Sequence, residues 1–345
     1  MKILVILPSL KKMGPINVAL STIKRLFDKG VSVSVAALDS GDLFEDFEHY
    51  SESLVLFQDS NRLVKLLKIR NFAMNFDIVH SHCLLPDIIG MTLSSKKTVS
   101  TLHCFLDIDY INLKGKIFGT LLTFVHLFVL RRIDKVVSCS GSVSDYTSDK
   151  YNLSSYVIRN GVDESKYAKE ELSVGKKLIL VSVGVLNKRK NVIETLEAFS
   201  SLDDKNMELW VVGDGPDYAR LVDSYIKDNI KFLGRIDNVR AVLNKSDVYV
   251  SSSLGEGLPM AMLEAMSEGL TYIVSDIPPH NEINKMSPGA GIVYEGSEKG
   301  LANEISRLSR LTISDYKRSS INSYTDNFTN EKMASEYLSF YQKHI

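Results

Sequence analysis

The sequence has little cysteine and no pattern typical of disulfide-rich or zinc-binding proteins. Three cysteines occur among its 345 residues, and no Cys-x-x-Cys pair is present: Cys83, Cys104 and Cys139. So few cysteines, odd in number, are typical of reduced, cytosolic proteins. His80, His82 and His103 lie beside two of them, at the ends of separate strand-like runs without finger-type spacing. Ordinary strand-end residues are therefore favoured over a metal site.

The chain also lacks a large charge excess. Its formal net charge is -1, which argues against a general polyanion binder and against nucleic acid as a partner. The first 150 residues carry 18 Lys+Arg against 15 Asp+Glu, so the mild positive balance lies in the first half. The length is sufficient for two hydrophobic cores, and the overall composition is ordinary for a globular protein.

No apolar run is long enough for a membrane span. The most apolar segment, IFGTLLTFVHLFVL (117–130), has 14 residues, and a spanning helix needs about 20. It is flanked by basic residues: Lys114, Lys116, Arg131 and Arg132. Two interpretations stay open. One is a buried helix, and the other is an interfacial helix whose basic ends meet anionic lipid headgroups.

Short Val/Ile/Leu-rich runs alternate with helix-length segments through most of the chain. The N-terminal MKILVILPSL is too short for a signal peptide and predicts a first strand. Pro15 and Gly30 suit the start and the end of the first helix. Continuous apolar strands separated by helices predict a parallel sheet covered on both faces. The series restarts after residues 160–175, so we predict two doubly wound α/β domains.

Ligands of open α/β sheets bind beyond the carboxyl ends of the strands, so the loops there are candidate sites. GVLNKRKN (184–191) places three cations before a helix, where a phosphate or plain solvation would explain them. GDGP (213–216) lacks G-x-G-x-x-G and is weak evidence for a nicotinamide cofactor.

The segment SLGEGLPMAMLEAM (253–266) contains two glutamates and no lysine or arginine. Pro259 is expected to start a helix, with Glu256 just before its N-terminus and Glu264 about 7–8 Å along it. A buried carboxylate normally has a partner, and we expect it to come from outside the chain. Two acceptor groups at this spacing suit the hydroxyls of a sugar and of a ribose. A capping role for Glu256 and a backbone-bonded role for Glu264 are the alternatives.

Together these motifs resemble the family-four group of retaining GT-B glycosyltransferases. The Glu-x7-Glu element is EGLPMAMLE (256–264), and the surrounding segments follow in the expected order: DIVHSH, TLH, KVVSCS, VIRNGVD, VGVLNKRKN, ELWVVGDGP, IKFLGRI and DVYVSSSLGEGLP. The resemblance covers nearly the whole chain. It implies two Rossmann-like domains facing across a cleft. We expect an acceptor-binding domain over 1–165, a nucleotide-sugar-binding domain over 170–322, and a helix over 323–345 packing back on the first domain.

The resemblance also implies roles for the matching residues of the second domain. Lys190 would contact the donor diphosphate, and Glu256 would bind the transferred sugar. Val185 stands where the family often has arginine, so either Arg189 supplies the second cation or the phosphate is held more weakly. The other implied donor contacts are the amides of Gly257, Leu258 and Met260, the carboxylate of Glu264 for the ribose, and the backbone near Arg235 and Ile236 for the base.

In the first domain, Gly14 would let the donor phosphates approach closely, and His103 would border the reacting sugar. Lys11, Lys12 and His82 are the expected acceptor contacts. The usual double glycine is replaced by Met13-Gly14-Pro15, and Cys104 follows His103 where glycine is common. These departures weaken any inference about the acceptor.

The implied reaction moves a sugar from a nucleoside-diphosphate donor, UDP-linked by the family prior, to a glycan or polyprenyl-diphosphate-linked acceptor with retention. The implied catalytic set is Lys190, Glu256 and His103, with no cofactor or metal. Bacterial O-antigen or capsule synthesis is the expected setting, in the cytoplasm or peripherally on the inner face of the cytoplasmic membrane. A catalytically silent nucleotide-sugar-binding subunit and a GT-B sugar-nucleotide epimerase are the alternatives.

Overall fold

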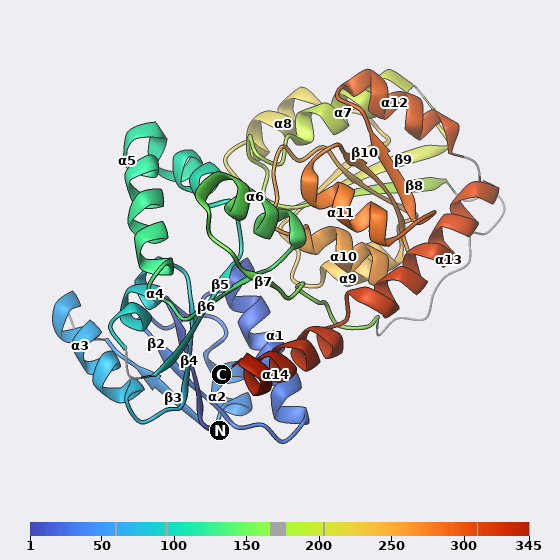
Figure 1. Ribbon diagram of the computed structural model, residues 1–345. Coiled ribbons are helices and arrows are strands. Elements are labelled where there is room, and N and C mark those ends of the chain that lie inside the picture. Colours follow the sequence, from blue (N-terminus) through green and yellow to red (C-terminus); the bar gives the residue numbers. More distant parts are fainter. Residues whose placement is uncertain (59–60, 94–95, 166–176, 203, 309, 345) are drawn as a thin grey trace. The chain divides into compact units, whose positions relative to one another are not determined.

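The computed structural model describes residues 1–345 except 59–60, 94–95, 166–176, 203, 309 and 345. The chain forms two compact units, which are coloured along the sequence in Figure 1. Unit 1 comprises Met1–Gly161 together with Asn330–Ile345, and unit 2 comprises Val162–Thr329. The domain joint expected at 165–170 falls mainly on residues 166–176, which lie outside the described residues.

Unit 1 is built on a seven-stranded parallel sheet in the order β3-β2-β1-β4-β5-β6-β7. The central strands β1, β2 and β4 are buried along their whole length, as near-continuous apolar runs of a parallel sheet require. The strands are β1 (Ile3–Leu7), β2 (Val33–Ala37), β3 (Ser53–Leu56), β4 (Ile78–His82), β5 (Lys97–Leu102), β6 (Lys135–Ser138) and β7 (Tyr156–Val157).

Helices cover both faces of this sheet (Figure 1). The helix α1 has Pro15 in its first turn, and Gly30 beyond its end adopts a φ of 72°, which glycine tolerates easily. It packs against α2 and α14, whereas α4 packs against α3 and α5. The helices are α1 (Gly14–Asp28), α2 (Phe44–Tyr50), α3 (Arg62–Ala73), α4 (Leu84–Met91), α5 (Leu106–Leu130), α6 (Gly141–Tyr151) and α14 (Asn330–His344).

Helix α5 is interrupted within its length. Gly115 has φ 77° and ψ 169°, so the helix consists of two parts that meet at this residue. An added Cβ at Gly119 would lie 2.5 Å from the backbone of Ile111, which shows that the second part folds back closely on the first. By length and composition alone, α5 is long and apolar enough to span a membrane. In the fold, 33% of its most apolar window is buried.

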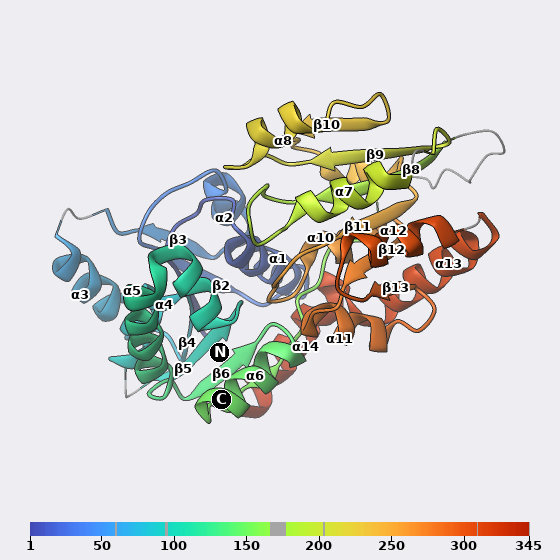
Figure 2. The same ribbon diagram turned by 90° about the horizontal axis from the view of Figure 1, so that it is seen from above.

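Unit 2 is built on a six-stranded parallel sheet in the order β10-β9-β8-β11-β12-β13, and Figure 2 shows these strands in that order. The strands are β8 (Leu178–Val183), β9 (Met207–Val212), β10 (Ile230–Gly234), β11 (Val248–Ser251), β12 (Thr271–Ser275) and β13 (Gly291–Tyr294). The prediction of two doubly wound parallel α/β domains is confirmed.

Seven helices of unit 2 lie within its described residues. Helix α12 packs on α7, and α10 packs on α9 and α13. They are α7 (Val192–Leu202), α8 (Tyr218–Ser224), α9 (Val239–Asn244), α10 (Met260–Ser267), α11 (Pro278–Met286), α12 (Glu298–Arg307) and α13 (Arg310–Asn327).

Three details differ from the sequence-based expectation. Helix α10 begins at Met260, with Pro259 at its N-cap. Helix α11 was not among the helices expected in the second domain. Its two leading prolines lie in the first turn, where a proline costs no hydrogen bond. Residues 323–327 end α13 in unit 2, and only α14, from Asn330, belongs to unit 1.

Each sheet contains one point where the strand order reverses. In unit 1 it lies between β1 and β4, and in unit 2 between β8 and β11. The chain leaves the two strands at such a point toward opposite faces, which opens a crevice beyond their carboxyl ends. The loops after β1, β4, β8 and β11 are therefore the places where this fold positions a ligand.

Candidate functional site

The loops after β8 and β11 meet at the reversal point of unit 2 and form an ion cluster. Lys190 donates from Nζ to Oε1 of Glu256 at 2.6 Å. Arg189 donates from Nη1 to Oε2 of Glu256 at 2.9 Å and to the carbonyl of Gly255 at 2.6 Å. Ser253 adds a hydroxyl bond to Oε1 at 2.8 Å. Both oxygens of Glu256 are thus bonded within the chain.

This cluster corrects one sequence-based expectation. Glu256 is 8% exposed, and its partners are cations of the GVLNKRKN loop rather than a ligand from outside the chain. Burial by itself would raise the pKa of Glu256, but Lys190 and Arg189 outweigh it and lower the pKa to about 2. The carboxylate is therefore ionised at neutral pH and accepts hydrogen bonds only.

Close backbone packing fixes the cluster. The amide of Leu254 donates to the carbonyl of Arg189 at 2.8 Å, which joins the two loops directly. An added Cβ at Gly184 would lie 3.0 Å from Cε of Lys190, so glycine there leaves room for the lysine. At Gly213 an added Cβ would lie 1.9 Å from the carbonyl oxygen of Gly184. The GDGP glycine is thus required by loop packing.

A second layer of residues, which sequence reasoning missed, supports Glu256 from β12 and α11. Ser275 donates from its hydroxyl to the carbonyl of Ser253 at 2.6 Å. His280 lies at the start of α11 and bonds through Nδ1 to the carbonyl of Ser275 at 2.9 Å. Burial lowers the pKa of His280 to about 4, so its ring is neutral. In the sequence, the one feature that marks this segment is the pair of prolines before His280, which stands at the start of the helix.

Glu264 lies on α10 and differs from Glu256 in having no ion partner. Its half-buried side chain makes no hydrogen bond or ion pair with any described residue. Burial raises its pKa, against a lowering by the charge of Arg240. Gly257 and Leu258 precede the helix, Met260 begins it, and Leu258 is buried. The structure therefore leaves the Glu264 carboxylate available for a ligand.

Arg240, another residue that sequence reasoning missed, anchors the end of α10. It donates to Oε1 of Glu268 at 2.9 Å, and the Glu268 side chain is completely buried. It also donates to the carbonyls of Asp163 and Glu164 at 2.6 and 3.2 Å. Arg240 thus ties the start of unit 2 to the helix that carries Glu264.

Arg235 and Ile236 follow β10 at the edge of the sheet. The carbonyl of Gly234, just before them, accepts a bond from the amide of Gly213 at 2.8 Å. Arg235 is exposed and Ile236 is half-buried. They follow β10, which is two strands away from β8 and its cation loop. No contact among the described residues tests their role, so the base contact remains a prediction.

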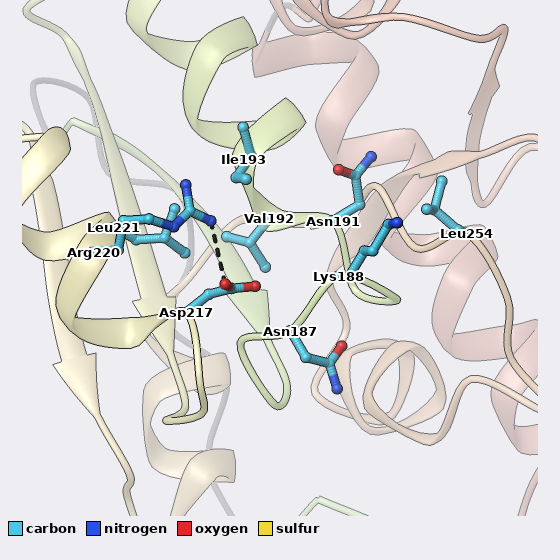
Figure 3. A pocket seen from close by; sticks show the side chains of 9 residues that line it. All are labelled: Asn187, Lys188, Asn191, Val192, Ile193, Asp217, Arg220, Leu221 and Leu254. Carbon is cyan, nitrogen blue, oxygen red and sulfur yellow. Dashed lines mark hydrogen bonds and ion pairs between the residues drawn. The ribbon is translucent and has the colours of Figure 1, made fainter. Parts of the chain in front are cut away.

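A cavity of about 290 Å³ lies beside the cation loop (Figure 3). Lys188, Asn191 and Leu254 line one side of it, and the ion pair of Asp217 with Arg220 at 3.2 Å lines the other. None of the expected donor-binding residues lines it, so this cavity neighbours the ion cluster without containing it.

Unit 1 places the expected acceptor residues in the loop after β1, at the end of β4 and directly after β5. Lys11 and Lys12 are exposed in the loop after β1, and Lys11 pairs with Asp39 at 3.4 Å. His82 Nδ1 lies 2.8 Å from His103 Nε2, and the two rings stack. An added Cβ at Gly14 would meet nothing within 4 Å, so packing does not require glycine there. The structure brings His82 and His103 together.

His80 stacks on His82 at a centroid distance of 4.5 Å and forms its own buried hydrogen bonds. Its ring bonds to the Tyr341 hydroxyl at 2.6 Å and to the Thr101 hydroxyl at 2.7 Å, which fixes α14 to the sheet of unit 1. Burial lowers the pKa of His80 to about 3, of His103 to about 4, and of His82 well below its usual value. Within the described residues, no group of three His, Cys, Asp or Glu is arranged to hold a metal ion.

An Asp-x-Asp triplet, a pattern able to hold a metal-bound diphosphate, was overlooked in expecting a metal-free reaction. It is Asp107-Ile108-Asp109, in the first turn of α5. Asp107 accepts bonds from Tyr146 at 2.9 Å and from Lys150 at 2.6 Å. Asp107 is therefore already used to join α5 to α6.

Comparison with known proteins agrees with this architecture. The profile described as Glycosyltransferase Family 4 matches residues 14–166, and that described as Glycosyl transferases group 1 matches residues 163–326. HepE of Anabaena, solved in complex with UDP and glucose, superposes with a TM-score of 0.83 over 99% of this chain and 100% of its own, at 17% identity. The chain belongs to the group 1 glycosyltransferases, has the GT-B type of fold, and is a glycosyltransferase.

Three curated relatives are bacterial enzymes of sugar transfer. N-acetyl-alpha-D-glucosaminyl L-malate synthase of Bacillus anthracis is 26% identical over 77% of this chain and 74% of its own. UDP-Gal:alpha-D-GlcNAc-diphosphoundecaprenol alpha-1,3-galactosyltransferase of Escherichia coli is 28% identical over 66% and 65%. The O-antigen biosynthesis glycosyltransferase WclY of Escherichia coli is 24% identical over 99% and 98%.

Proposed function

We propose that this enzyme transfers a sugar, with retention of anomeric configuration, from a UDP-linked donor to a lipid-linked glycan of bacterial surface polysaccharide synthesis. One observation carries the proposal: two cations and a buried, ionised glutamate are gathered at the strand reversal of unit 2. Cations beyond the carboxyl ends of parallel strands suit a diphosphate. A carboxylate among them suits the hydroxyls of the attached sugar.

The donor diphosphate would bind Lys190 and Arg189. Both already bond to Glu256, so their positions are fixed before the substrate arrives, and little reorganisation is needed as charge develops on the leaving group. Arg189 would supply the second cation in place of an arginine at Val185, which is exposed and lacks charge. The family resemblance implies that the leaving diphosphate itself helps deprotonate the acceptor hydroxyl on the same face.

Glu256 would bind the transferred sugar, since it is ionised at neutral pH and can only accept hydrogen bonds. Gly257, Leu258 and Met260, at the N-terminus of α10, would contribute amides to sugar and phosphate. The carboxylate of Glu264 would take the ribose hydroxyls, which supply the partner that it lacks among the residues that the structure describes. The backbone near Arg235 and Ile236 would contact the base.

Unit 1 would bind the acceptor through the loops after β1, β4 and β5. Lys11 and Lys12 would meet the phosphates of a polyprenyl-diphosphate-linked sugar. His82 and His103 form a neutral, hydrogen-bonded pair suited to hydroxyls, and His103 is the candidate that contacts the reacting sugar. Gly14 would admit a phosphate close to the backbone at the start of α1. No metal or cofactor is proposed.

The proposed acceptor class rests on the activities for which two relatives are named. One acts on a sugar linked to diphosphoundecaprenol, and another is an O-antigen glycosyltransferase. The donor nucleotide follows the UDP named for the same galactosyltransferase and for HepE. This proposal includes action at a membrane surface, because lipid-linked acceptors are bilayer components. The cytoplasmic side of that membrane is the side expected from the family resemblance.

A donor-depletion screen tests the proposal. The enzyme is incubated with UDP-glucose, UDP-galactose, UDP-N-acetylglucosamine or GDP-mannose, with and without a bacterial membrane lipid extract, and the remaining donor is measured. One UDP-sugar should disappear only with the extract, and NMR of the product should show the anomeric configuration of the donor. Conversion without extract would indicate an epimerase, and use of GDP-mannose alone would overturn the choice of nucleotide. Binding of donor without turnover would indicate a silent subunit.

A further inference from the structure

The second part of α5, residues 116–130, exposes an apolar face. Ile117 is 82% exposed and Phe118 is 68% exposed. The other exposed members of this face follow at helical spacing and are, with Leu113 from the first part, Leu121, Phe124, Val125 and Phe128. Most exposed apolar side chains of a soluble protein are scattered singly, whereas a contiguous patch marks an interaction surface. We call these seven residues the α5 apolar face.

The opposite side of the same helix is firmly attached to unit 1, so the exposure does not come from a loosely held segment. Gly119, Thr123, Leu127 and Leu130 are buried. His126 bonds through Nε2 to Asp87 of α4 at 2.7 Å, with both side chains almost fully buried, and Tyr110 bonds to its Nδ1 at 2.9 Å. This polar network fixes which side of the helix faces outward.

Basic residues border the α5 apolar face at both ends. Lys114 and Lys116 flank the bend at Gly115, and Arg131 and Arg132 follow the helix. No Asp or Glu occurs from residue 110 to 133, although both acids and bases are frequent elsewhere. The Arg132 guanidinium lies 3.5 Å from the centre of the Phe128 ring, so charge and apolar surface are adjacent.

We propose that the α5 apolar face docks unit 1 onto an anionic bilayer surface. Leu113, Ile117 and Phe118 surround the bend and would enter the boundary between headgroups and acyl chains, as interfacial helices do to a depth of about 5–10 Å. The flanking lysines and arginines would contact lipid phosphates. The two parts of α5 hold 9 and 15 residues, both short of the about 20 that a spanning helix requires, so the contact is superficial.

The charge pattern favours lipid over a second copy of the chain. A twofold contact through this face would bring eight cations together with no carboxylate in the segment to balance them. An anionic headgroup layer neutralises the same four cations and accepts the apolar side chains at once. The surface does not depend on the sugar donor, so its test is separate from that of the proposed function.

Vesicle co-sedimentation tests the docking surface. The full chain is mixed with vesicles of phosphatidylglycerol and phosphatidylethanolamine, or of phosphatidylcholine alone, none of which contains a lipid-linked glycan. Binding should be strong to the anionic vesicles, weak to the neutral ones, and reduced by 0.5 M salt, because screening then acts over a few ångströms. Equal pelleting with both vesicles, or with neither, would overturn the proposal.

Two substitutions separate the apolar contribution. Ile117→Glu should weaken binding to anionic vesicles by on the order of 10-fold or more, since it removes an aliphatic group that would enter the bilayer and adds a repelled charge. The control is Ile226→Glu, which replaces an isoleucine of unit 2 with 86% exposure and should leave binding unchanged. Both variants should keep the wild-type melting temperature, because neither side chain is packed. Unchanged binding of Ile117→Glu would contradict the proposal.

A second pair of variants tests the cations. Lys114→Gln with Lys116→Gln should weaken binding about 30-fold, which corresponds to about 1 kcal/mol for each basic residue. The control pair is Lys205→Gln with Lys245→Gln, two exposed lysines of unit 2, which makes the same change in net charge. Sedimentation equilibrium without lipid completes the test. A dimer that Ile117→Glu dissociates, without any binding to vesicles, would show that a second copy covers this face.

Discussion

Arg240 bonds to Glu268 at 2.9 Å, whereas Glu264, one helical turn earlier, has no hydrogen-bonded cation among the described residues. Glu264 lies on α10, and Glu268 is at the C-cap of the same helix. The two carboxylates thus lie on one helix, but Arg240 forms its ion pair with Glu268. Glu268 is expected to stabilise the fold, and Glu264 to serve the ligand.

Substitution with glutamine should separate these two roles. Glu264→Gln should leave the free energy of unfolding unchanged or raise it by on the order of 1 kcal/mol, because it removes a half-buried charge without a partner. Glu268→Gln should lower it by about 3 kcal/mol, because Arg240 loses its carboxylate. Urea unfolding at pH 7 measures both values.

Ligand binding should show the reverse order. Glu264→Gln should weaken UDP-sugar binding about 10- to 100-fold, the loss expected when hydrogen bonds to a charged group are removed. Isothermal titration calorimetry measures this change, with Glu268→Gln as the reference at a temperature where it is folded. A Glu264→Gln protein that unfolds more easily than the wild type would show that the carboxylate is structural.

Lys190 and Lys188 offer a matched pair within one loop. Lys190→Ala should lower the transfer rate at least about 100-fold, the loss typical when one preorganised charge-stabilising group is removed. It should also lower the free energy of unfolding by about 1–3 kcal/mol, because Arg189 is then the one ion partner that Glu256 keeps within the described part of the chain. Lys188 is exposed and lines the neighbouring cavity, so Lys188→Ala should change neither quantity strongly.

The assay is donor turnover well below the melting temperature of both variants. Arg189→Ala extends the test, since it should lose at least 10-fold if Arg189 is the second phosphate cation in place of Val185. Similar rates for Lys190→Ala and Lys188→Ala would remove the diphosphate role of Lys190.

The sequence was sufficient to predict both doubly wound sheets, since each strand is a local apolar run. The ion cluster could not be predicted from the sequence. Lys190 and Glu256 are 66 residues apart, and they meet because β8 and β11 are neighbours in the sheet. Strand order is a property of the whole fold, so the residues of one segment do not reveal it. The expectation of an external partner for Glu256 was wrong for this reason.

Glycine and proline positions show a second limit. Gly213 looked like part of a nucleotide loop, but its missing side chain makes room for the carbonyl of Gly184. The prolines before His280 begin a helix that the sequence analysis did not predict. Both residue types allow several structures, and only their tertiary neighbours determine which one forms. His280, Ser275 and Arg240 support the site from segments without any motif.

The histidines of unit 1 predict a steep loss of stability in mild acid. The pKa values of His80, His82 and His103 are lowered in the fold, mainly by burial, to about 3 for His80 and about 4 for His103. An unfolded histidine takes up a proton below about pH 6.5, so the stabilisation is present above that pH and is lost as pH falls. Each histidine should contribute a slope of up to about 1.4 kcal/mol per pH unit.

Urea unfolding at pH 7.5, 6.5 and 5.5 measures this slope. His103→Gln should reduce it by about one histidine, because the substitution removes one group that binds a proton only after unfolding. The control is His49→Gln on α2, where the imidazole is exposed. Identical slopes for wild type and His103→Gln would mean that the His82–His103 pair is open to protonation in the folded protein.

Transfer activity should not depend on a divalent metal ion. The proposed diphosphate contacts are Lys190, Arg189 and the N-terminus of α10, which supply positive charge without a metal. Donor turnover in 5 mM EDTA should therefore stay within about twofold of the rate in magnesium or manganese.

The Asp-x-Asp triplet gives this prediction a sharp control. Asp109→Asn changes the triplet and spares the bonds of Asp107 to Tyr146 and Lys150, so its rate should be the same with and without metal. Activity that EDTA abolishes, that manganese restores, and that Asp109→Asn removes would assign the diphosphate to a metal at α5 and overturn the metal-free mechanism.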